Sequence, residues 1–336
     1  MPGWFARVQA IRFKIARRPF PQDAMSTVAA PRKRRLLWLG GLLAGGLLAW
    51  AYFHLPILAY HVAPEFWHAS EQREGSIWLP DYHVVIQAHP VEGVAGNLSG
   101  LTFNDETGTL FAAINRPARV VELTIEGELL RSIDVDGVRD MESITHVGGS
   151  RFVVADERSN GLYAIELEAQ TTQVEAHPMG QLPVRSVHRN QGVEALSWDE
   201  HNNRLLVGQE RFPVRVLSLE NTPGLSTPTG ADPGQDWLRR GFWSWFIGDL
   251  SGLTTHRSSG NLLVLSDQSA VLIEYSRSGQ PISMLPLWQG QHGLVRRVPQ
   301  AEGVAMAPDG SLFVVSEPNL FYRFEKPATA LADAET

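Results

Sequence analysis

The sequence predicts an all-β fold, a β-propeller with five blades, preceded by one N-terminal transmembrane helix. A unit of three short apolar strands occurs five times, at a spacing of about 40 to 57 residues, with glycine or asparagine turns between the strands. One apolar segment follows a basic cluster near the amino end. The repeat predicts the propeller, and the apolar segment predicts the helix.

The first unit shows the pattern. Its strands cover residues 98–103, 109–115 and 120–123. Turn residues between alternating apolar runs are typical of hairpins. A fourth, outer strand is expected after several units, for example over residues 129–133 and 281–284. The other four units begin at Met141, Val193, Leu250 and Ala301.

The last unit ends after Phe324 without a fourth strand, whereas a strand with no unit of its own lies ahead of the first, at residues 83–87. We expect residues 83–87 to complete the last blade, because this pairing closes the ring and removes an exposed edge. Residues 220–248 are rich in proline and tryptophan. We interpret them as an insertion, and a degenerate sixth blade there is the alternative.

Composition limits the chemistry. The chain has 336 residues, a formal charge of −7 and no cysteine. Disulfides, thiolate catalysis and cysteine-ligated zinc are therefore excluded. The propeller, predicted over residues 80–326 and followed by a disordered tail at 327–336, is acidic, so nucleic acid is not expected as a partner.

Residues 1–35 contain nine Lys or Arg and one acid. An apolar run follows, and we predict a transmembrane anchor over residues 36–56 and a linker over residues 57–79. The positive-inside rule places residues 1–35 in the cytoplasm as a basic tail and the propeller across the cytoplasmic membrane. The alternative is a cleaved signal segment ending at Ala49-Trp50-Ala51, which also exports the propeller.

Polar residues recur where the strands of each unit begin and end. The start of one antiparallel strand lies beside the end of the next, so both sets are expected at one mouth of the central channel. The first strands begin with Ser99, Glu142, Glu194, Ser251 and Glu302. The second strands end with Asn115, Asp156, Glu157, Glu210, Asp267 and Glu317.

Carboxylates gathered in one place repel each other unless they share protons or bind a cation, and oxygen ligands in irregular geometry suit calcium. The sequence therefore predicts a calcium site among these acids. The alternative is structural, because an acid beside a turn often caps backbone amides. The predicted ligands are Glu142, Glu194, Glu302, Asp156, Glu157, Glu210, Asp267 and Glu317.

Arginines and amides in the loops after the second strands are expected to form a rim at the same mouth. An arginine rim can hold carboxylates by bidentate pairing or receive an anionic ligand. The sequence has no HExxH spacing, no Gly-x-Ser-x-Gly elbow and no Walker-type loop, and no acid–base pair is singled out. The predicted rim residues are Asn115, Arg116, Arg158, Arg211 and Asn319.

The blocks at residues 97–102, 114–117, 154–158, 249–252, 300–306 and 315–324 resemble those of the SdiA-regulated family. The resemblance implies a bacterial inner-membrane protein with a single span and a periplasmic propeller, and it implies no reaction. We expect a binding or scaffold module whose partner is an envelope protein or a small ligand, because five similar blade ends form a ligand surface without an evident nucleophile or acid–base pair. The alternative is a metal-dependent hydrolase of phosphoesters or lactones, because the strand start at Glu302 is similar to that of calcium-dependent lactonases and phytase-like propellers.

Overall fold

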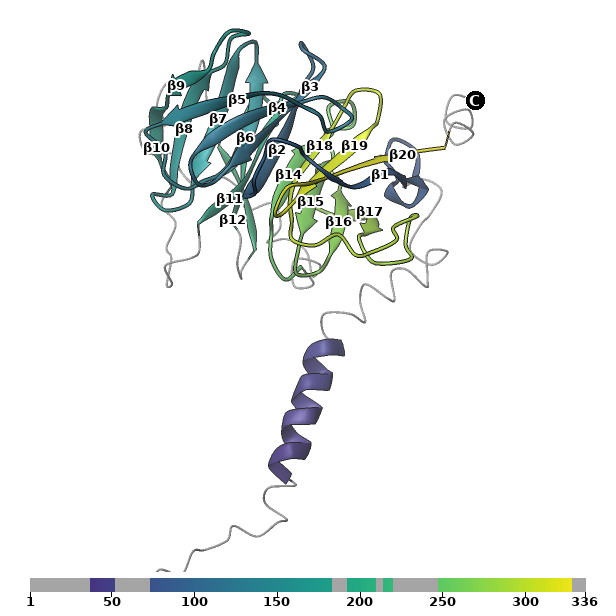
Figure 1. The fold of residues 1–336 in the computed structure, drawn as a ribbon. Helices are drawn as coiled ribbons and strands as arrows, with labels where there is room; N and C mark the ends of the chain where they lie inside the picture. The colour runs from purple at the N-terminus through teal and green to yellow at the C-terminus, as the bar shows by residue number, and fades with distance from the viewer. Residues whose placement is uncertain (1–36, 52–72, 183–191, 210–213, 220–246, 328–336) are drawn as a thin grey trace, which may run out of the picture. The chain divides into compact units, whose positions relative to one another are not determined.

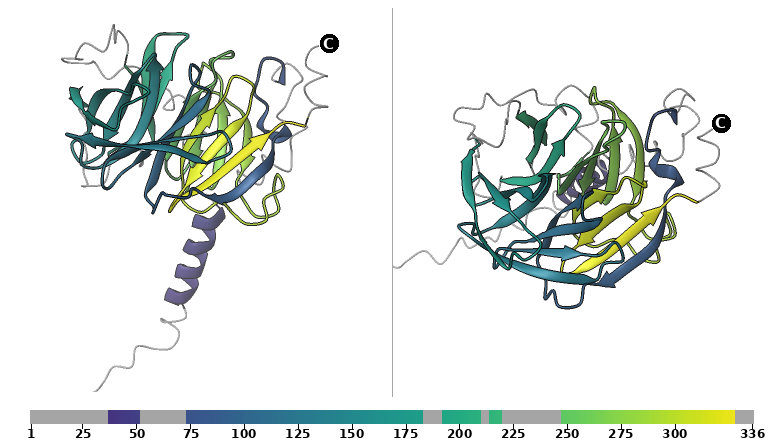
Figure 2. Two further views of the ribbon diagram at one scale, coloured as in Figure 1. Left: turned by 45° about the horizontal axis from the view of Figure 1, so that its top comes forward. Right: turned by 90° about the horizontal axis from the view of Figure 1, so that it is seen from above.

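The computed structural model describes residues 37–51, 73–182, 192–209, 214–219 and 247–327. The strands in these ranges form five sheets, and the protein is an all-β, five-bladed propeller (Figures 1 and 2). The fold class predicted for the repeat is therefore confirmed. Residues 220–246, which contain most of the predicted insertion, lie outside the described ranges.

The blades follow the chain in order. Blade 1 contains β2 (Leu98–Asn104), β3 (Thr109–Ile114), β4 (Arg119–Leu123), β5 (Leu129–Asp136) and β9 (Gln173–Glu175). Blade 2 contains β6 (Met141–Gly148), β7 (Arg151–Asp156), β8 (Gly161–Glu166) and β10 (His177–Gln181). Blade 3 contains β11 (Val193–Asp199), β12 (Arg204–Gln209) and β13 (Arg215–Leu219). Blade 4 contains β14 (Gly252–Thr255), β15 (Leu262–Ser266), β16 (Val271–Tyr275) and β17 (Pro281–Pro286).

Blade 5 closes the ring with strands from both ends of the propeller. It contains β18 (Ala301–Met306), β19 (Leu312–Ser316), β20 (Leu320–Glu325) and β1 (His83–Pro90). Strand β1 pairs antiparallel with β20, as the unpaired strand at residues 83–87 predicted. This pairing covers the outer edge of β20 with a strand from the amino-terminal end of the propeller.

The hydrophobic core is divided among the interfaces between blades. Five clusters of buried side chains each combine residues of two neighbouring blades. For example, Phe111 of blade 1 packs against Phe152 of blade 2, with ring centroids 4.7 Å apart. The innermost strands β2, β6, β11, β14 and β18 contact one another around the axis. Their ends therefore meet at the two mouths of the channel.

The chain enters the propeller through a short segment before β1. Ile77, Leu79 and Tyr82 are buried in the cluster between blades 4 and 5, around the 3-10 helix η1 (Leu79–Asp81). Glu274 of β16 anchors this segment, because its carboxylate accepts the backbone N–H groups of Ile77 and Trp78 at 2.7 and 3.1 Å. Part of the predicted linker over residues 57–79 thus packs on blade 4.

The predicted anchor is described only over residues 37–51, which are helical. Among the described residues, no helix has both the length and the apolar character needed to cross a membrane. The transmembrane anchor therefore stays a prediction. Residues 36 and 52–56 of the predicted span lie outside the described ranges.

Candidate functional site: the acidic channel mouth

In blades 1, 2, 3 and 5, the polar residue that opens the inner strand lies where the strand pairing shifts register. Glu142 falls in the shift between Met141 and Ser143 of β6. The same shift occurs around Glu194 of β11, around Glu302 of β18 and over Ser99-Gly100 of β2. An unpaired residue of this kind is aimed away from the regular pleat, and such bulges are frequent beside functional sites.

Glycines beside these positions let neighbouring inner strands approach closely. A Cβ on Gly100 would lie 2.7 Å from the Cα of Ser143 in the next blade, and one on Gly303 would lie 2.7 Å from the carbonyl oxygen of Ser99. Neither position tolerates a side chain without moving backbone. The Ser-Gly and Glu-Gly pairs thus bring the polar side chains of adjacent blades together.

Glu142 is held by groups of blade 1. The hydroxyl of Ser99 lies 2.9 Å from Glu142 Oε2, and the Asn115 amide donates to Glu142 Oε1 at 3.3 Å. Burial and, to a smaller extent, the nearby carboxylates of Asp140 and Glu157 raise the pKa of Glu142 to about 7, against the lowering effect of the Ser99 hydrogen bond. Asn115 Oδ1 is buried and has no hydrogen-bond partner among the described residues.

Three carboxylates of blade 2 come close enough to share one ion. Oxygen atoms of Asp140, Glu142 and Glu157 all lie within 4.8 Å of one another. Asp140 is buried, and its Oδ1 lies 2.9 Å from Arg116 Nε of blade 1. Of the two roles considered for the rim arginines, Arg116 makes an ion pair with a carboxylate of this mouth.

Glu302 enters the same mouth from blade 5. Burial, together with the charges of Asp267, Glu317, Glu142 and Asp249, raises the pKa of Glu302 to about 9. The starts of β6 and β18 lie at the same end of the channel, because both strands pack on β2 beside Ser99 and Gly100. Ser251, at the corresponding place before β14, has a buried hydroxyl with no hydrogen-bond partner among the described residues.

Other predicted ligands are engaged by the backbone. Asp156 is buried and accepts the N–H groups of Arg139 and Ser159 at 3.2 and 3.3 Å. Asp267 accepts the N–H of Ala301 at 3.3 Å and lies 3.8 Å from Arg297. These contacts fit the structural alternative, in which Asp156 and Asp267 cap backbone amides next to turns.

The remaining predicted residues differ in their surroundings. Glu317 accepts the side-chain amide of Gln300 at 3.3 Å, and Glu194 is half-buried at the start of β11. The amide of Asn319 donates to the carbonyl oxygens of Val91 and Val94, so it fixes a loop instead of facing a ligand. Arg158 is exposed after β7. Glu210 and Arg211 lie outside the described residues.

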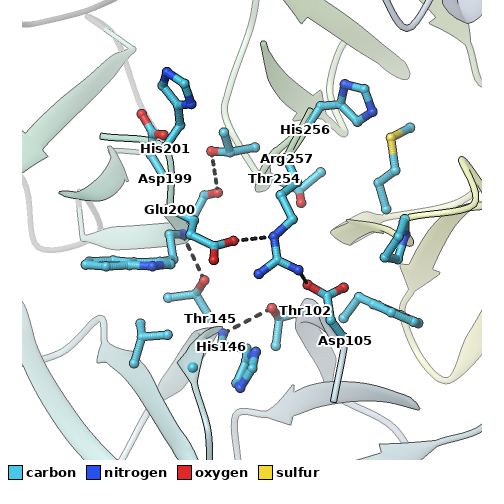
Figure 3. Close-up of a pocket in the computed structure, with 18 of the residues that line it drawn as sticks. Thr102, Asp105, Thr145, His146, Asp199, Glu200, His201, Thr254, His256 and Arg257 are labelled. Atoms are coloured by element: carbon cyan, nitrogen blue, oxygen red, sulfur yellow. Dashed lines mark hydrogen bonds and ion pairs between the residues drawn. The ribbon is translucent and has the colours of Figure 1, made fainter. Parts of the chain in front are cut away.

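A second recess lies at the opposite mouth and was not predicted. It has a volume of 660 Å³ and is lined by residues at the far ends of the inner strands and in the turns that follow (Figure 3). Arg257 lies in it between Asp105 and Glu200. The sequence signal for this recess is one charged residue in the turn after each of three inner strands, namely Asp105, Glu200 and Arg257. The signal is weak because charged residues are common in turns.

Comparisons with solved structures find matches of low identity. Glutaminyl cyclase from Myxococcus xanthus is 15% identical over 73% of this chain and 95% of that chain, with a TM-score of 0.48. A luciferin-regenerating enzyme is 15% identical over 74% of this chain and 96% of that chain, with a TM-score of 0.46. The calcium-binding protein regucalcin from Agrobacterium tumefaciens is 12% identical over 72% of this chain and 92% of that chain, with a TM-score of 0.46.

A family model gives a more specific result than these structures. The model described as SdiA-regulated matches residues 74–325, which are the propeller and the segment that enters it. This range includes the sequence blocks that carried the resemblance and both channel mouths. The chain belongs to the SdiA-regulated family.

Proposed function

We propose that this protein is a binding module whose acidic channel mouth holds a calcium ion. The observation that carries the proposal is the convergence of Asp140, Glu142 and Glu157 within 4.8 Å. The buried Oδ1 of Asn115, whose amide nitrogen already contacts Glu142, offers a fourth oxygen ligand. Carboxylate and amide oxygens without nitrogen or sulfur ligands are the set that calcium prefers.

A bound cation would also offset the electrostatic repulsion between the carboxylates at this mouth. The pKa of Glu142 is raised to about 7 because its charge is buried near two other carboxylates. Calcium supplies the positive charge that a proton otherwise provides, so binding releases protons and strengthens as pH rises. A bound calcium ion would supply a positive charge that could receive an anionic or carbonyl-bearing ligand, and Arg116, which pairs with Asp140, would contribute a second positive charge.

Thermal unfolding of the purified chain tests the calcium site. At pH 7.5, calcium at a hundred times its dissociation constant is expected to add about 2.7 kcal/mol to the free energy of unfolding, and chelator should remove this gain. Glu142→Gln should lose most of the effect, whereas Glu166→Gln, an exposed acid at the end of β8, should keep it. An unfolding midpoint that calcium leaves unchanged in the unaltered protein would rule out the site.

We also propose that the module is tethered to the bacterial inner membrane, with the propeller in the periplasm and an envelope protein or small ligand as its partner. Support comes from the basic residues before position 36 and from the apolar side chains that the helix at 37–51 exposes, among them Leu39, Leu43 and Leu47. A carboxy-terminal alkaline phosphatase fusion should be active. Activity only of a reporter that works in the cytoplasm would contradict this topology.

Metal-dependent hydrolysis of phosphoesters or lactones is the second candidate function. The observation that favours it is the pKa of Glu142, about 7, because a general acid or base works best when its pKa lies near the working pH. Calcium-dependent turnover of a phosphoester or lactone by the purified chain, lost in Glu302→Gln and Glu142→Gln, would establish it. Calcium binding without turnover would leave the binding module as the function.

A further inference from the structure

We propose that the mouth opposite the acidic one is a second binding site, that it takes an organic cation bearing a guanidinium or primary ammonium group, and that Arg257 occupies it as an internal plug. This inference does not depend on the proposed calcium site. It rests on a cavity, on the ion pairs of Arg257 and on the balance of charge around them.

The cavity is distinct from the acidic mouth because it lies at the other ends of the inner strands. The acidic residues open these strands, whereas the cavity is lined where the strands end and turn, with all five blades contributing. Its volume of 660 Å³ lies within the range of about 300–1,000 Å³ typical of small-molecule sites. Residues from each blade that line it include Thr102, His146, Trp198, His256 and Met306.

Arg257 joins three blades across this mouth. It follows β14 in blade 4, and its guanidinium contacts Asp105 of blade 1 and Glu200 of blade 3 (Figure 3). Asp105 and Glu200 come from turns that are far apart in the sequence. Two carboxylates from separate blades thus hold one planar cation at the centre of a cavity. The guanidinium shows which chemical group the two acids receive.

The plug is displaceable because its ion pairs are exposed. The side chains of Arg257 and Glu200 are both 54% exposed, and that of Asp105 is 30% exposed. Ion pairs with such access to water contribute about 0–1 kcal/mol each. A ligand can regain that energy with its own cation and add contact with the half-buried aromatic walls at Trp198 and Phe103, which favour a guanidinium or ammonium over their faces.

The other charged groups facing the cavity favour a cation over an anion. Glu106 accepts the N–H of Gly149 at 2.7 Å, and Asp199 pairs with Arg204 at 2.8 Å, so neither acid depends on Arg257. When Arg257 swings outward, Asp105 and Glu200 are left as two negative charges without their partner.

The histidines of the cavity do not compensate these charges. Burial lowers the pKa of His256, so it is neutral at pH 7. The Nε2 atom of His201 lies 3.1 Å from Arg277 Nη1. His146 contacts the carbonyl oxygen of Gly149 at 2.9 Å through one ring nitrogen. The open mouth is therefore negative and attracts a cation.

Titration calorimetry of the full chain with agmatine, which has a guanidinium at one end and an ammonium at the other, tests the proposal, with glutarate as the anionic counterpart. All titrations contain chelator. Arg257→Ala is expected to bind agmatine at least tenfold more tightly than the unaltered protein, because the competing guanidinium is gone. Asp105→Asn with Glu200→Gln should weaken binding at least tenfold. Arg296→Ala, at an exposed arginine outside the cavity, should change nothing.

Three outcomes would overturn the proposal. Glutarate binding that disappears in Arg257→Ala would make the cavity an anion site. Loss of agmatine binding in Glu142→Gln would place the cation at the acidic mouth. No gain in affinity on removing Arg257 would mean that its ion pairs only hold the three blades together. If Arg257→Ala does not fold, Arg257→Gln keeps the side-chain length without the charge and carries the same expectation.

Discussion

Replacing Glu302 with Gln should make the protein less sensitive to alkaline pH. The pKa of Glu302 is raised to about 9, mainly by burial, whereas in the unfolded chain the group titrates near 4.5. Between these two values the native state binds a proton that the unfolded state has released. The contribution of Glu302 to the free energy of unfolding therefore falls as pH rises through this window. This contribution is highest below pH 4.5.

The size of the effect follows from the proton difference. One proton corresponds to a slope of about 1.4 kcal/mol per pH unit, so the unaltered protein should lose about 2 to 3 kcal/mol through Glu302 between pH 6 and pH 8. Glutamine has nearly the same shape and no charge to bury. Glu302→Gln should therefore gain stability relative to the unaltered protein by that amount over the same interval.

Urea unfolding at pH 6, 7 and 8, in the presence of chelator, measures this difference. Glu166→Gln is the control, because Glu166 is an exposed acid at the end of β8. The reasoning is refuted if the difference in unfolding free energy between Glu302→Gln and the unaltered protein is the same at all three pH values. In that case the native carboxyl is already ionised at pH 6 and is compensated by its surroundings.

Three further predictions concern the fold. Glu274→Ala should cost about 3 kcal/mol in urea unfolding, because this fully buried carboxylate accepts from Ile77, Trp78, Asn261 and Ser283, whose donors would be left unpaired. Gly303→Ala should cost about 1–3 kcal/mol through its contacts with the backbone of blade 1, whereas Gly108→Ala, which meets nothing, should cost only its positive-φ strain. Deleting residues 73–90 should abolish cooperative unfolding seen by circular dichroism, because blade 5 would lose β1.

The architecture could be predicted from the sequence because a propeller repeats one short pattern of strands and turns. Each unit alternates apolar strands with turns, and the missing outer strand of the last unit matched the unpaired strand ahead of the first. Strand direction also predicts that Glu142 and Glu302, at the starts of β6 and β18, lie at one end of the channel, since antiparallel pairing fixes which strand ends lie together. These inferences require only local patterns and the closure of a ring.

The chemistry of the individual acids could not be predicted in the same way. Asp156 and Glu157 are neighbours in the sequence, yet Asp156 caps two backbone amides while Glu157 lies beside Asp140 and Glu142. Which of two adjacent carboxylates faces the mouth depends on how the turn after β7 is folded. The contacts of Arg257 could not be predicted for a related reason. Asp105, Glu200 and Arg257 meet only when blades 1, 3 and 4 are arranged around one axis.

The inner strands also determine how the two mouths relate to each other. Each strand presents its first residues to the acidic mouth and its last residues to the Arg257 cavity, about 15–20 Å away at 3.3 Å per residue. Hydroxyl groups near the middle join neighbouring blades: Thr102 accepts the N–H of His146, and Thr145 accepts that of Trp198. A wall joined in this way resists sliding of one blade past the next. Groups this far apart without shared partners contribute additively, so we expect ligands at the two mouths to bind independently.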